Sequence, residues 1–506
     1  MRMIAVCAVL AAAMTGPTAE AQDIPAATER MNDYLDRFSD SVGPGYAVVI
    51  VTADDVLINR AEGLRRAANG APLTSDTPMY IASQTKAYVG LLGAVLDERG
   101  ILPLDTPIDT YWPQVRWPDS MDPADYTLRD LLTHQVPFRN TLITFLEANI
   151  MNIAMEDYPE LMSLAATPRD PGFRYDNIGY NVYAAILETA TGRNWRDWLD
   201  EIVFEPLQLE HTSTRTSDFG LEELSWGHLW LGEENGWYDV QPKTDGMMQS
   251  AGGIVTSPND MITWLQLQLR GEAPEAGLTH SMLQTAQTSY VETGREDAEN
   301  PYDMPCSGYA LGWELCTYQD FDVHIHGGTF TGNRSMMAFV PEEGVGIAVF
   351  SNSDNMTGWW TQTAVRMFLH FLSGDPEADQ MVSDNIDRYA AITRNYLGWR
   401  LEQVAENEAD SVWQGWDWSP DAELLSEYAG SYRNASLPIN LDLRVSGDGL
   451  EATMGGYSAS LRPARIDLFG GRSHPLEPFD QVRFERNETG EIIAFDWGGR
   501  RFDRRH

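Results

Sequence analysis

The sequence predicts an α+β fold followed by a small all-β barrel, and three observations lead to that expectation. β-branched runs near the start give way to a long helical middle, and strand-like segments return after residue 305. If the first and last strands share one sheet with helices packed on it, this region is one α+β domain. Beyond residue 426, short alternating segments separated by Gly, Asn and Asp turns predict a barrel.

The predicted elements follow in order along the chain. Residues 45–63 form two β-branched runs around Asp54-Asp55, which predicts a hairpin. Residues 83–98 carry apolar side chains at helical spacing, with Gly100 placed to end the helix. The later expected helices are 127–134, 177–192, 194–204, 257–271 and 356–374, and the expected strands are 308–315, 321–328, 334–341 and 344–352. A further hairpin at 226–240 carries aromatic side chains that either line a substrate groove or pack a core edge.

The first residues have the pattern of a secretory signal. A basic Arg2 precedes an apolar run, and Ala19-Glu20-Ala21 supplies the small-x-small cleavage pattern. The apolar run is too short to remain as a membrane anchor. We therefore expect a signal peptide at 1–21 and a periplasmic or secreted protein without a membrane span.

Composition and charge restrict the possible partners. The 506 residues include 75 acidic and 35 basic side chains, which gives a formal net charge of −40. Such a charge argues against nucleic acid and against anionic membrane surfaces. A hydrophobic content of 43% with 16 tryptophans is enough for a sizeable core. Oligomeric state is left open.

Two cysteines remain after the signal peptide, Cys306 and Cys316. Export would permit a disulfide between them. However, the intervening residues alternate like one extended strand, which would hold the two Cα atoms far beyond the ~7 Å limit for a bridge. Pairing needs a bend at Gly308 or Gly312. The spacing argues against a disulfide but leaves the question open.

A serine and a lysine lie one helical turn apart at the start of the predicted helix 83–98. Ser83 and Lys86 share a helix face, and only one other lysine, Lys243, occurs in the chain. A neutral amine can remove the proton of a serine hydroxyl, whereas arginine cannot lose its own proton. The backbone N–H of Ser83, at a helix N-terminus, can also bind an oxyanion. The alternative is an ordinary surface pair, which the scarcity of lysine makes less attractive.

Two other stretches carry candidate chemistry. Tyr175 and Asn177 both precede a predicted helix, where a phenolate could act as a base or the pair could simply pack and cap the helix. His326 ends a strand before Gly327 and Gly328, whose missing side chains permit close approach of a substrate. His324 alternates onto the same face as His326, but no further ligand follows at short spacing, so we expect no metal site.

In combination and in order, these motifs resemble the serine β-lactamase and penicillin-binding-protein-like hydrolases, in the branch of class C β-lactamases, D-aminopeptidases and β-lactamase-fold esterases. The resemblance covers about residues 45–374. It implies an antiparallel sheet flanked by helices plus an all-helical subdomain. The tail resembles the lipocalin-like domain often attached to such enzymes. The expected segments are a signal peptide at 1–21, the hydrolase domain at 22–374, a helical connector at 375–425 and the barrel at 426–506.

The resemblance implies a role for each motif residue. Ser83 would be the acylated nucleophile, Lys86 would assist its deprotonation, and Tyr175 would be the general base for attack and the acid toward the leaving group. Asn177 would orient the substrate or Lys86. His326, Gly327 and Gly328 stand where the family has its K-T-G strand, and the N–H groups of Ser83 and Thr329 would form the oxyanion hole. No cofactor is required, and Lys243 is expected in a turn away from the site.

Three departures from the family pattern modify this expectation. His326 replaces the lysine that meets the carboxylate of penicillins, which demotes a dedicated β-lactamase. Residues 135–137 replace a flexible Ser-Gly pair at the mouth of the site, and Asp176 stands where small residues are common, with its carboxylate expected to face outward. We expect a serine hydrolase of a small-molecule or short-peptide amide, with D-residues possible in the substrate. The alternatives are an esterase or acyltransferase of the same fold, or a non-catalytic sensor module.

Overall fold

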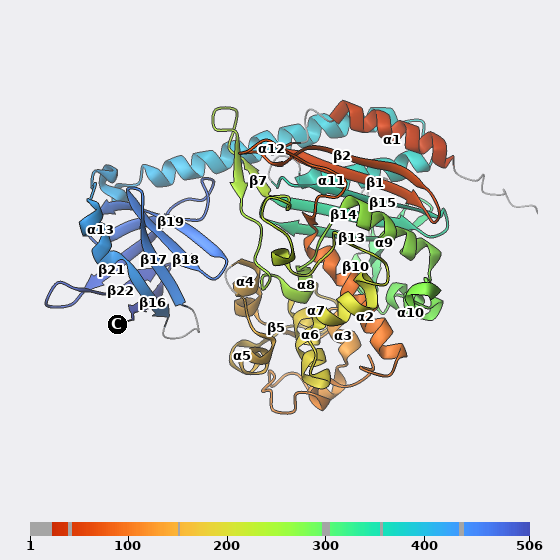
Figure 1. Ribbon diagram of the computed structural model, residues 1–506, viewed down its shortest axis with the longest axis horizontal. Helices are drawn as coiled ribbons and strands as arrows, with labels where there is room; N and C mark the ends of the chain where they lie inside the picture. The colour runs from red at the N-terminus through yellow and green to blue at the C-terminus, as the bar shows by residue number, and fades with distance from the viewer. Residues whose placement is uncertain are drawn as a thin grey trace, which may run out of the picture.

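The computed structural model describes residues 23–38, 43–149, 152–295, 304–354, 358–434 and 440–505, so the expected signal peptide lies outside the described residues. Figure 1 shows a sheet-and-helix body on one side and a barrel on the other. The long helix α12 (Ala378–Glu408) runs from the body to the barrel. Within the described ranges, no helix is both long and apolar enough to cross a bilayer.

The centre of the body is an antiparallel sheet that joins the two ends of the predicted α+β region. Its described strands follow the order β10-β11-β12-β13-β14-β15-β1-β2-β3. Strand β1 pairs with β2 on one side and with β15 on the other, which confirms that the first and last strands share a sheet. The strands are β1 (Gly45–Thr52), β2 (Val56–Arg66), β3 (Ala71–Pro72), β10 (Val291–Arg295), β11 (Cys306–Tyr309), β12 (Glu314–Tyr318), β13 (Phe321–Phe330), β14 (Asn333–Val340) and β15 (Val345–Ser351).

Helices cover both faces of this sheet, which explains the unbroken apolar sequence of β1. One set of alternate side chains, including Val48 and Ile50, packs with helices α1 (Ile24–Phe38) and α11 (Gly358–Leu372). The other set, including Val49, joins the core formed with the remaining helices. A strand buried on both faces needs apolar residues at every position.

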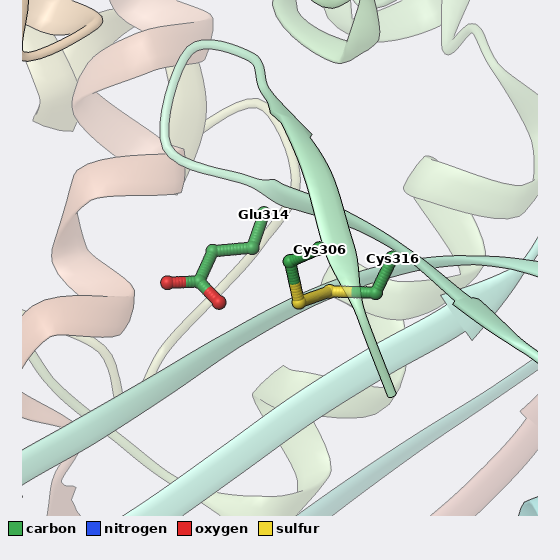
Figure 2. Close-up of side chains that lie close together, drawn as sticks. All are labelled: Cys306, Glu314 and Cys316. Atoms are coloured by element: carbon green, nitrogen blue, oxygen red, sulfur yellow. A yellow bond between two sulfur atoms is a disulfide. The ribbon is translucent and has the colours of Figure 1, made fainter. Parts of the chain in front are cut away.

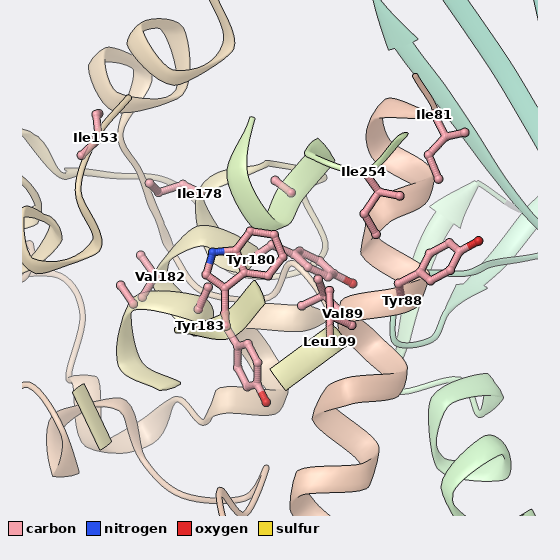
Figure 3. Packing of buried hydrophobic residues seen from close by; sticks show 14 of the residues in the cluster. Ile81, Tyr88, Val89, Ile153, Ile178, Tyr180, Val182, Tyr183, Leu199 and Ile254 are labelled. Atoms are coloured by element: carbon pink, nitrogen blue, oxygen red, sulfur yellow. The ribbon is translucent and has the colours of Figure 1, made fainter. Parts of the chain in front are cut away.

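The helical layer forms one core with the inner face of the sheet. Its helices are α2 (Thr85–Glu98), α3 (Leu128–Leu132), α4 (Thr141–Asn149), α5 (Tyr158–Ala165), α6 (Ile178–Thr191), α7 (Trp195–Leu199), α8 (Gln249–Gly252), α9 (Pro258–Arg270) and α10 (His280–Gln287). Figure 3 shows side chains of α6, including Tyr180 and Tyr183, packed close to Tyr88 and Val89 of α2. This packing fixes α2 and α6 relative to each other.

Short elements complete the body. Three two-stranded ribbons are described: β4 (Met79–Tyr80) with β9 (Val255–Thr256), β5 (Phe138–Arg139) with β6 (Thr167–Pro168), and β7 (Gly227–Trp230) with β8 (Trp237–Val240). The last ribbon confirms the predicted hairpin at 226–240. Single-turn helices include η1 (Ala82–Gln84), η2 (Ile108–Thr110), η3 (Pro123–Asp125), η4 (Met155–Asp157), η6 (Thr216–Asp218) and η7 (Pro274–Ala276), and a π-helical turn, η5 (Asp200–Phe204), follows α7.

The two cysteines form a disulfide, although their spacing argued against one. Residues 308–315 are not one strand: 308–309 end β11, 314–315 begin β12, and the chain reverses between them. Cys306 and Cys316 are disulfide-bonded across this hairpin (Figure 2). Gly312 makes the reversal possible with a φ of 87°. A Cβ on Gly312 would lie 2.4 Å from the Lys86 carbonyl carbon, so the bend packs directly on the first turn of α2.

The C-terminal segment is a closed antiparallel barrel, as predicted. Its described strands are β16 (Gly430–Asn434), β17 (Asn440–Ser446), β18 (Gly449–Met454), β19 (Tyr457–Arg465), β20 (Leu468–Arg472), β21 (Asp480–Arg486), β22 (Ile492–Trp497) and β23 (Arg500–Arg504), and β16 pairs with β23 to close it. Buried aromatic rings fill the interior, among them Phe469, Phe484 and Phe495. The turn η8 (Ser411–Trp416) and helix α13 (Ala422–Tyr428) lead into it.

The barrel touches the body through the turn between β18 and β19. A Cβ on Gly456 would lie 2.8 Å from the Met247 sulfur and 3.0 Å from the side chain of Thr244. These two residues belong to the segment that leads into α8. The barrel therefore packs on a loop of the body as well as being joined to it by α12.

We predict that replacing both cysteines by serine lowers the free energy of unfolding by about 3 kcal/mol, because the bridge no longer restricts the unfolded chain. Guanidinium denaturation followed by circular dichroism measures the change. Reductant should destabilise the wild type by a similar amount and leave the double variant unaffected. Two titratable thiols in the unreduced wild-type protein would contradict the disulfide.

Candidate active site

The predicted nucleophile lies in a tight turn between a short strand and α2. Ser83 belongs to η1, and the preceding residue, Ala82, has a φ of 47°, which is unusual for a residue other than glycine. The Ile81 carbonyl oxygen accepts a hydrogen bond from Ser335 Oγ at 3.0 Å. The turn leaves Ser83 partly exposed while its neighbours in sequence are buried.

Lys86 is fully buried one turn further along, and three oxygen atoms surround its amine. Lys86 Nζ lies 3.2 Å from Ser83 Oγ, 2.9 Å from Asn177 Oδ1 and 2.7 Å from the Ala251 carbonyl oxygen. Burial lowers the pKa of Lys86 to about 7, although the nearby Asp176 carboxylate opposes the shift. Near neutral pH a large fraction of the amine is therefore uncharged and able to take a proton from Ser83.

Tyr175 approaches the same serine from the loop before α6. The Ser83 hydroxyl hydrogen-bonds to the phenol, and the Tyr175 ring lies 4.9 Å from Lys86 Nζ. The outer part of the ring is exposed, with 43% of the residue accessible. Loss of hydration around the hydroxyl raises the pKa of Tyr175, and the hydrogen bond from Ser83 opposes that shift only in part. The phenol therefore keeps its proton at neutral pH.

Asn177 and Asp176 make different contacts at the start of α6. Asn177 stands at the N-terminus of α6, yet its side chain makes no capping bond there and turns to Lys86 instead. Asp176 supplies the cap, because its Oδ1 accepts the backbone N–H of Ile178 at 3.0 Å. The expectation that Asp176 faces outward is wrong: the carboxylate is half-buried and acts electrostatically on both Lys86 and Tyr175.

Strand β13 brings the third motif beside the nucleophile turn. Strand β12 pairs with β13 only as far as Ile325. Among the described residues, no strand pairs with this side of β13 beyond Ile325, and β13 contacts η1. A Cβ on Gly328 would lie 2.0 Å from the Ile81 carbonyl oxygen, and only glycine permits this approach. Thr329 follows at the same edge, with its hydroxyl 2.5 Å from Arg334 Nη1.

His326 is a neutral side chain in this site. Its Nδ1 lies 2.8 Å from the Gly327 carbonyl oxygen, which can only accept, so Nδ1 carries the hydrogen. Its Nε2 then accepts from the Tyr309 hydroxyl at 3.3 Å. Burial and the nearby Lys86 lower the pKa of His326 to about 3. His326 therefore supplies no positive charge for a substrate carboxylate.

Aromatic rings form one wall of the site, and the sequence analysis did not single them out. Tyr309 and His134 lie with their ring centroids 4.8 Å apart, and His134 lies 4.6 Å from Tyr175. His134 Nδ1 accepts the backbone N–H of Asp176 at 3.2 Å. Tyr309 lies three residues after Cys306, on the disulfide-bonded hairpin. Its proximity to the site depends on the bend at Gly312, for which the sequence pattern gave no reliable signal.

The segment 135–137, which departs from the family pattern, is held in place by one arginine. Arg169 donates hydrogen bonds to the carbonyl oxygens of His134 and Val136, both at 2.8 Å. It also donates to the Arg174 carbonyl oxygen at 2.8 Å. These bonds connect the 134–137 segment to the loop that carries Tyr175, so a fixed contact replaces the flexible Ser-Gly pair.

Lys243, which was expected in a turn away from the site, is a buried lysine. Its amine is buried and lies 5.5 Å from the centre of the Tyr80 ring, and burial lowers its pKa to about 7. Its Nζ donates to the adjacent Thr244 carbonyl oxygen at 3.3 Å. Within the described residues, these contacts of Lys243 do not reach Ser83. Both lysines of this chain are therefore buried.

One group of side chains has the composition of a metal site. Glu314 lies within 4.8 Å of the sulfur atoms of Cys306 and Cys316 (Figure 2). The two sulfur atoms are bonded to each other, so neither is a thiolate ligand. In the part of the chain that the structure describes, His324 and His326 belong to no such group.

The comparison with protein families agrees with this geometry. The family model described as Beta-lactamase matches residues 31–367. The chain belongs to this family. Its members and the structural neighbours of the chain include serine hydrolases of the β-lactamase fold.

Two curated relatives match part of their own length. Protein flp of Staphylococcus aureus (strain MW2) is 23% identical over 311 residues, which are 61% of this chain and 59% of that protein. Unguisins hydrolase ungD of Aspergillus violaceofuscus is 24% identical over 368 residues, 67% of this chain and 63% of that protein. The chain thus spans about three fifths of each.

Three solved structures share the fold. The octameric penicillin-binding protein homologue from Pyrococcus abyssi has a TM-score of 0.57 at 18% identity and covers 95% of this chain and 99% of its own. The D-amino acid amidase from Ochrobactrum anthropi SV3 also has a TM-score of 0.57, at 20% identity, over 70% of this chain and 99% of its own. EstCE1, a hydrolase with promiscuous acyltransferase activity, has a TM-score of 0.56 at 18% identity and covers 68% of this chain and 99% of its own.

We predict that kcat/KM falls as the pH drops below about 7, because protonation of Lys86 removes the base beside Ser83. The amine of the free enzyme acts in its neutral form, so kcat/KM is highest at pH values above the pKa of Lys86. A pH profile between 5 and 9 measures this limb. The pKa of His326, at about 3, is too low to cause it.

Lys243 is the matched control for this profile, because burial lowers its pKa to the same region. The Lys243→Gln variant should keep the acidic limb. A limb that disappears in Lys243→Gln, or a flat profile in the wild type, would contradict the assignment to Lys86.

Proposed function

We propose that this protein is an exported serine hydrolase that forms an acyl-enzyme on Ser83 and cleaves small amides or short peptides, with D-residues among those accepted. The observation that carries the proposal is the buried Lys86 amine 3.2 Å from Ser83 Oγ, with its pKa lowered to about 7. A surface serine–lysine pair would have neither the burial nor the three oxygen partners. Export rests on the sequence pattern of residues 1–21.

In the proposed first step, Lys86 accepts the Ser83 proton while Oγ bonds to the substrate carbonyl carbon. The carbonyl oxygen becomes an oxyanion that the N–H groups of Ser83 and Thr329 stabilise. Lys86 serves better than Tyr175 as the base, because burial moves the two pKa values in opposite directions from their ordinary values. Lys86 thus takes the role of base that the family resemblance gave to Tyr175, while Tyr175 keeps the role of acid toward the leaving group.

In the second step, the carbon–nitrogen bond breaks and the leaving amine takes a proton. The protonated Tyr175 phenol is placed to donate it, and Lys86 returns the proton it took from Ser83 to the phenol. Water then attacks the acyl-enzyme by the same steps in reverse order, which regenerates the Ser83 hydroxyl and releases the acid. No metal or organic cofactor takes part in these steps.

Two features support an amide over a penicillin or a simple ester. The neutral His326 offers no charge to a substrate carboxylate, which disfavours a dedicated β-lactamase. A protonated phenol beside the nucleophile helps an amine leave, and amides need that help far more than activated esters do. An esterase or acyltransferase remains the second candidate, because EstCE1 shares this fold.

We predict that Ser83→Ala abolishes turnover and covalent labelling by a fluorophosphonate, since it removes the hydroxyl beside the Lys86 amine. The assay compares kcat/KM for D-alanine anilide and p-nitrophenyl butyrate. A value of about 10⁴ M⁻¹s⁻¹ or more for the anilide identifies a peptidase or amidase. Turnover of the ester alone would leave the esterase. Labelling of the Ser83→Ala variant with activity kept would disprove the assignment of the nucleophile.

Tyr175→Phe provides the matched comparison between the two substrates. It should lower the rate with the anilide by about 10²-fold or more, because the amine loses its proton donor. The rate with p-nitrophenyl butyrate should fall much less, since nitrophenolate leaves without a proton. Equal losses for both substrates would mean that Tyr175 does not act on the leaving group. Acylation without release would favour the sensor module.

A further inference from the structure

Behind the site, a chain of buried hydrogen bonds links Lys86 to a carboxyl group that the proposed steps do not use. The Ala251 carbonyl oxygen, which accepts from Lys86, belongs to the one-turn helix α8. The backbone N–H of Ala251 donates to Asn181 Oδ1 at 3.1 Å. Ser250 Oγ lies 3.0 Å from the same oxygen and 3.0 Å from the Tyr180 carbonyl oxygen, and its single hydrogen can go to either. Asn181 therefore contacts Ala251, the residue of α8 that accepts from Lys86, and its neighbour Ser250.

The other end of the Asn181 amide points to Glu147. Asn181 Nδ2 donates to Glu147 Oε2, and the Tyr158 hydroxyl donates to Glu147 Oε1. Glu147 is 2% exposed and lies on α4, whereas Asn181 lies on α6. Its backbone oxygen also accepts the N–H of Met248 at 3.1 Å. Glu147 thus contacts the entry to α8 through its backbone and the centre of α8 through Asn181.

The backbone at the entry to α8 explains why such support is needed. Met248 and Gln249 have φ values of 64° and 45°, a left-handed conformation that each non-glycine residue adopts at a cost of about 1 kcal/mol or more. Consecutive residues of this kind persist only where surrounding contacts hold them. Without those contacts, we expect the backbone to relax and the Ala251 carbonyl oxygen to move away from Lys86.

An amide has one donor end and one acceptor end, so a partner at one end fixes the other. Asn181 Oδ1 stays turned toward the Ala251 N–H and Ser250 Oγ while Nδ2 has an acceptor on the opposite side. Glu147 is the acceptor that the structure provides there. Removing it leaves a buried N–H₂ group without a partner, which costs about 1–3 kcal/mol and favours rotation of the amide away from α8.

We propose that Glu147 is a positioning residue for the reaction: through Asn181 it fixes the Ala251 carbonyl oxygen on Lys86 and so sets the geometry and the proton affinity of the base. The inference rests on the proposed role of Lys86. Glu147 takes no part in the chemistry itself, because its hydrogen bonds go to Tyr158, Asn181 and Met248 and not to Ser83 or Tyr175.

The charged and titratable neighbours allow the effect to be assigned. The titratable groups that face Lys86 are Asp176, Tyr175 and Tyr180. His134 and His326 are also nearby, but burial lowers the pKa of each, so both rings are neutral. Glu147 itself is faced by Tyr158, by Asn181 and, electrostatically, by Arg196. Burial raises the pKa of Glu147 well above its usual range, so a neutral glutamine is a close replacement.

The test follows the rate at which a fluorophosphonate labels Ser83, as a function of pH, in wild type, Glu147→Gln and Glu147→Met. Methionine keeps the length of the side chain but offers Asn181 no oxygen. We expect the maximal rate of Glu147→Met to fall by about 10- to 100-fold, because the base is displaced from its attacking geometry. Its acidic limb should also move to lower pH by about one unit, since losing a carbonyl acceptor disfavours the ammonium.

Glu147→Gln should stay within about threefold of the wild-type rate, with an unmoved limb, because its amide oxygen still accepts from Asn181. Asp260→Asn is the control for loss of a buried carboxyl elsewhere. Asp260 accepts from the His211 N–H and the Thr212 hydroxyl, both at 2.7 Å, and has no contact with Lys86. Asp260→Asn should lower stability without moving the limb.

If Glu147→Met does not fold, Asn181→Ala makes the same test, because it removes the next link toward Ala251. If both fold, the double variant should shift the limb no further than either single variant, as expected for two residues in one chain of contacts. A wild-type profile in Glu147→Met, or equal losses in the Gln and Met variants with an unmoved limb, would overturn the proposal. Failure to label Ser83 in the wild type would instead refute the proposed function.

Discussion

The site depends on one physical constraint: a lysine amine must be buried beside a serine without becoming an isolated charge. Burial makes the ammonium costly, and that cost is what leaves Lys86 able to act as a base near neutral pH. The cost is bearable only because oxygen atoms from three elements surround the amine. Those elements are the turn before α2, the start of α6 and the short helix α8, so the whole helical layer has to be placed correctly.

The sheet and the helical layer meet at the same point. Strand β13 runs against the nucleophile turn, and its contact at Gly328 leaves no room for a side chain. Left-handed backbone at Ala82 on one side and at Met248 on the other aims Ser83 and α8 toward each other. Such conformations are unfavourable in isolation, and the buried core formed by α2, α6 and the inner face of the sheet stabilises them. The strain therefore lies where the chemistry is proposed to occur.

Much of the fold follows from local pattern. The hairpin at 45–63, helices α2, α6 and α9 and the closed barrel were predictable because periodicity and turn residues carry their signal. The serine–lysine pair was predictable from spacing and from the scarcity of lysine. The disulfide was not, because a single glycine reverses a segment that alternates like a strand. Asp176, Lys243 and Glu147 were also beyond reach, since their environments are created by contacts between residues far apart in the sequence.

The scarcity of lysine also permits a direct test of whether the Lys86 amine loses its proton near pH 7 and so can act as a base. Protein labelled with [ε-¹³C]lysine should show only two lysine signals. In the Lys243→Gln variant the signal of Lys86 should be the one that remains. We expect the chemical shift of this signal to titrate with a midpoint near pH 7. A midpoint near the ordinary lysine value of 10.5 would contradict it, because the amine beside Ser83 would then be a fixed cation and not a base.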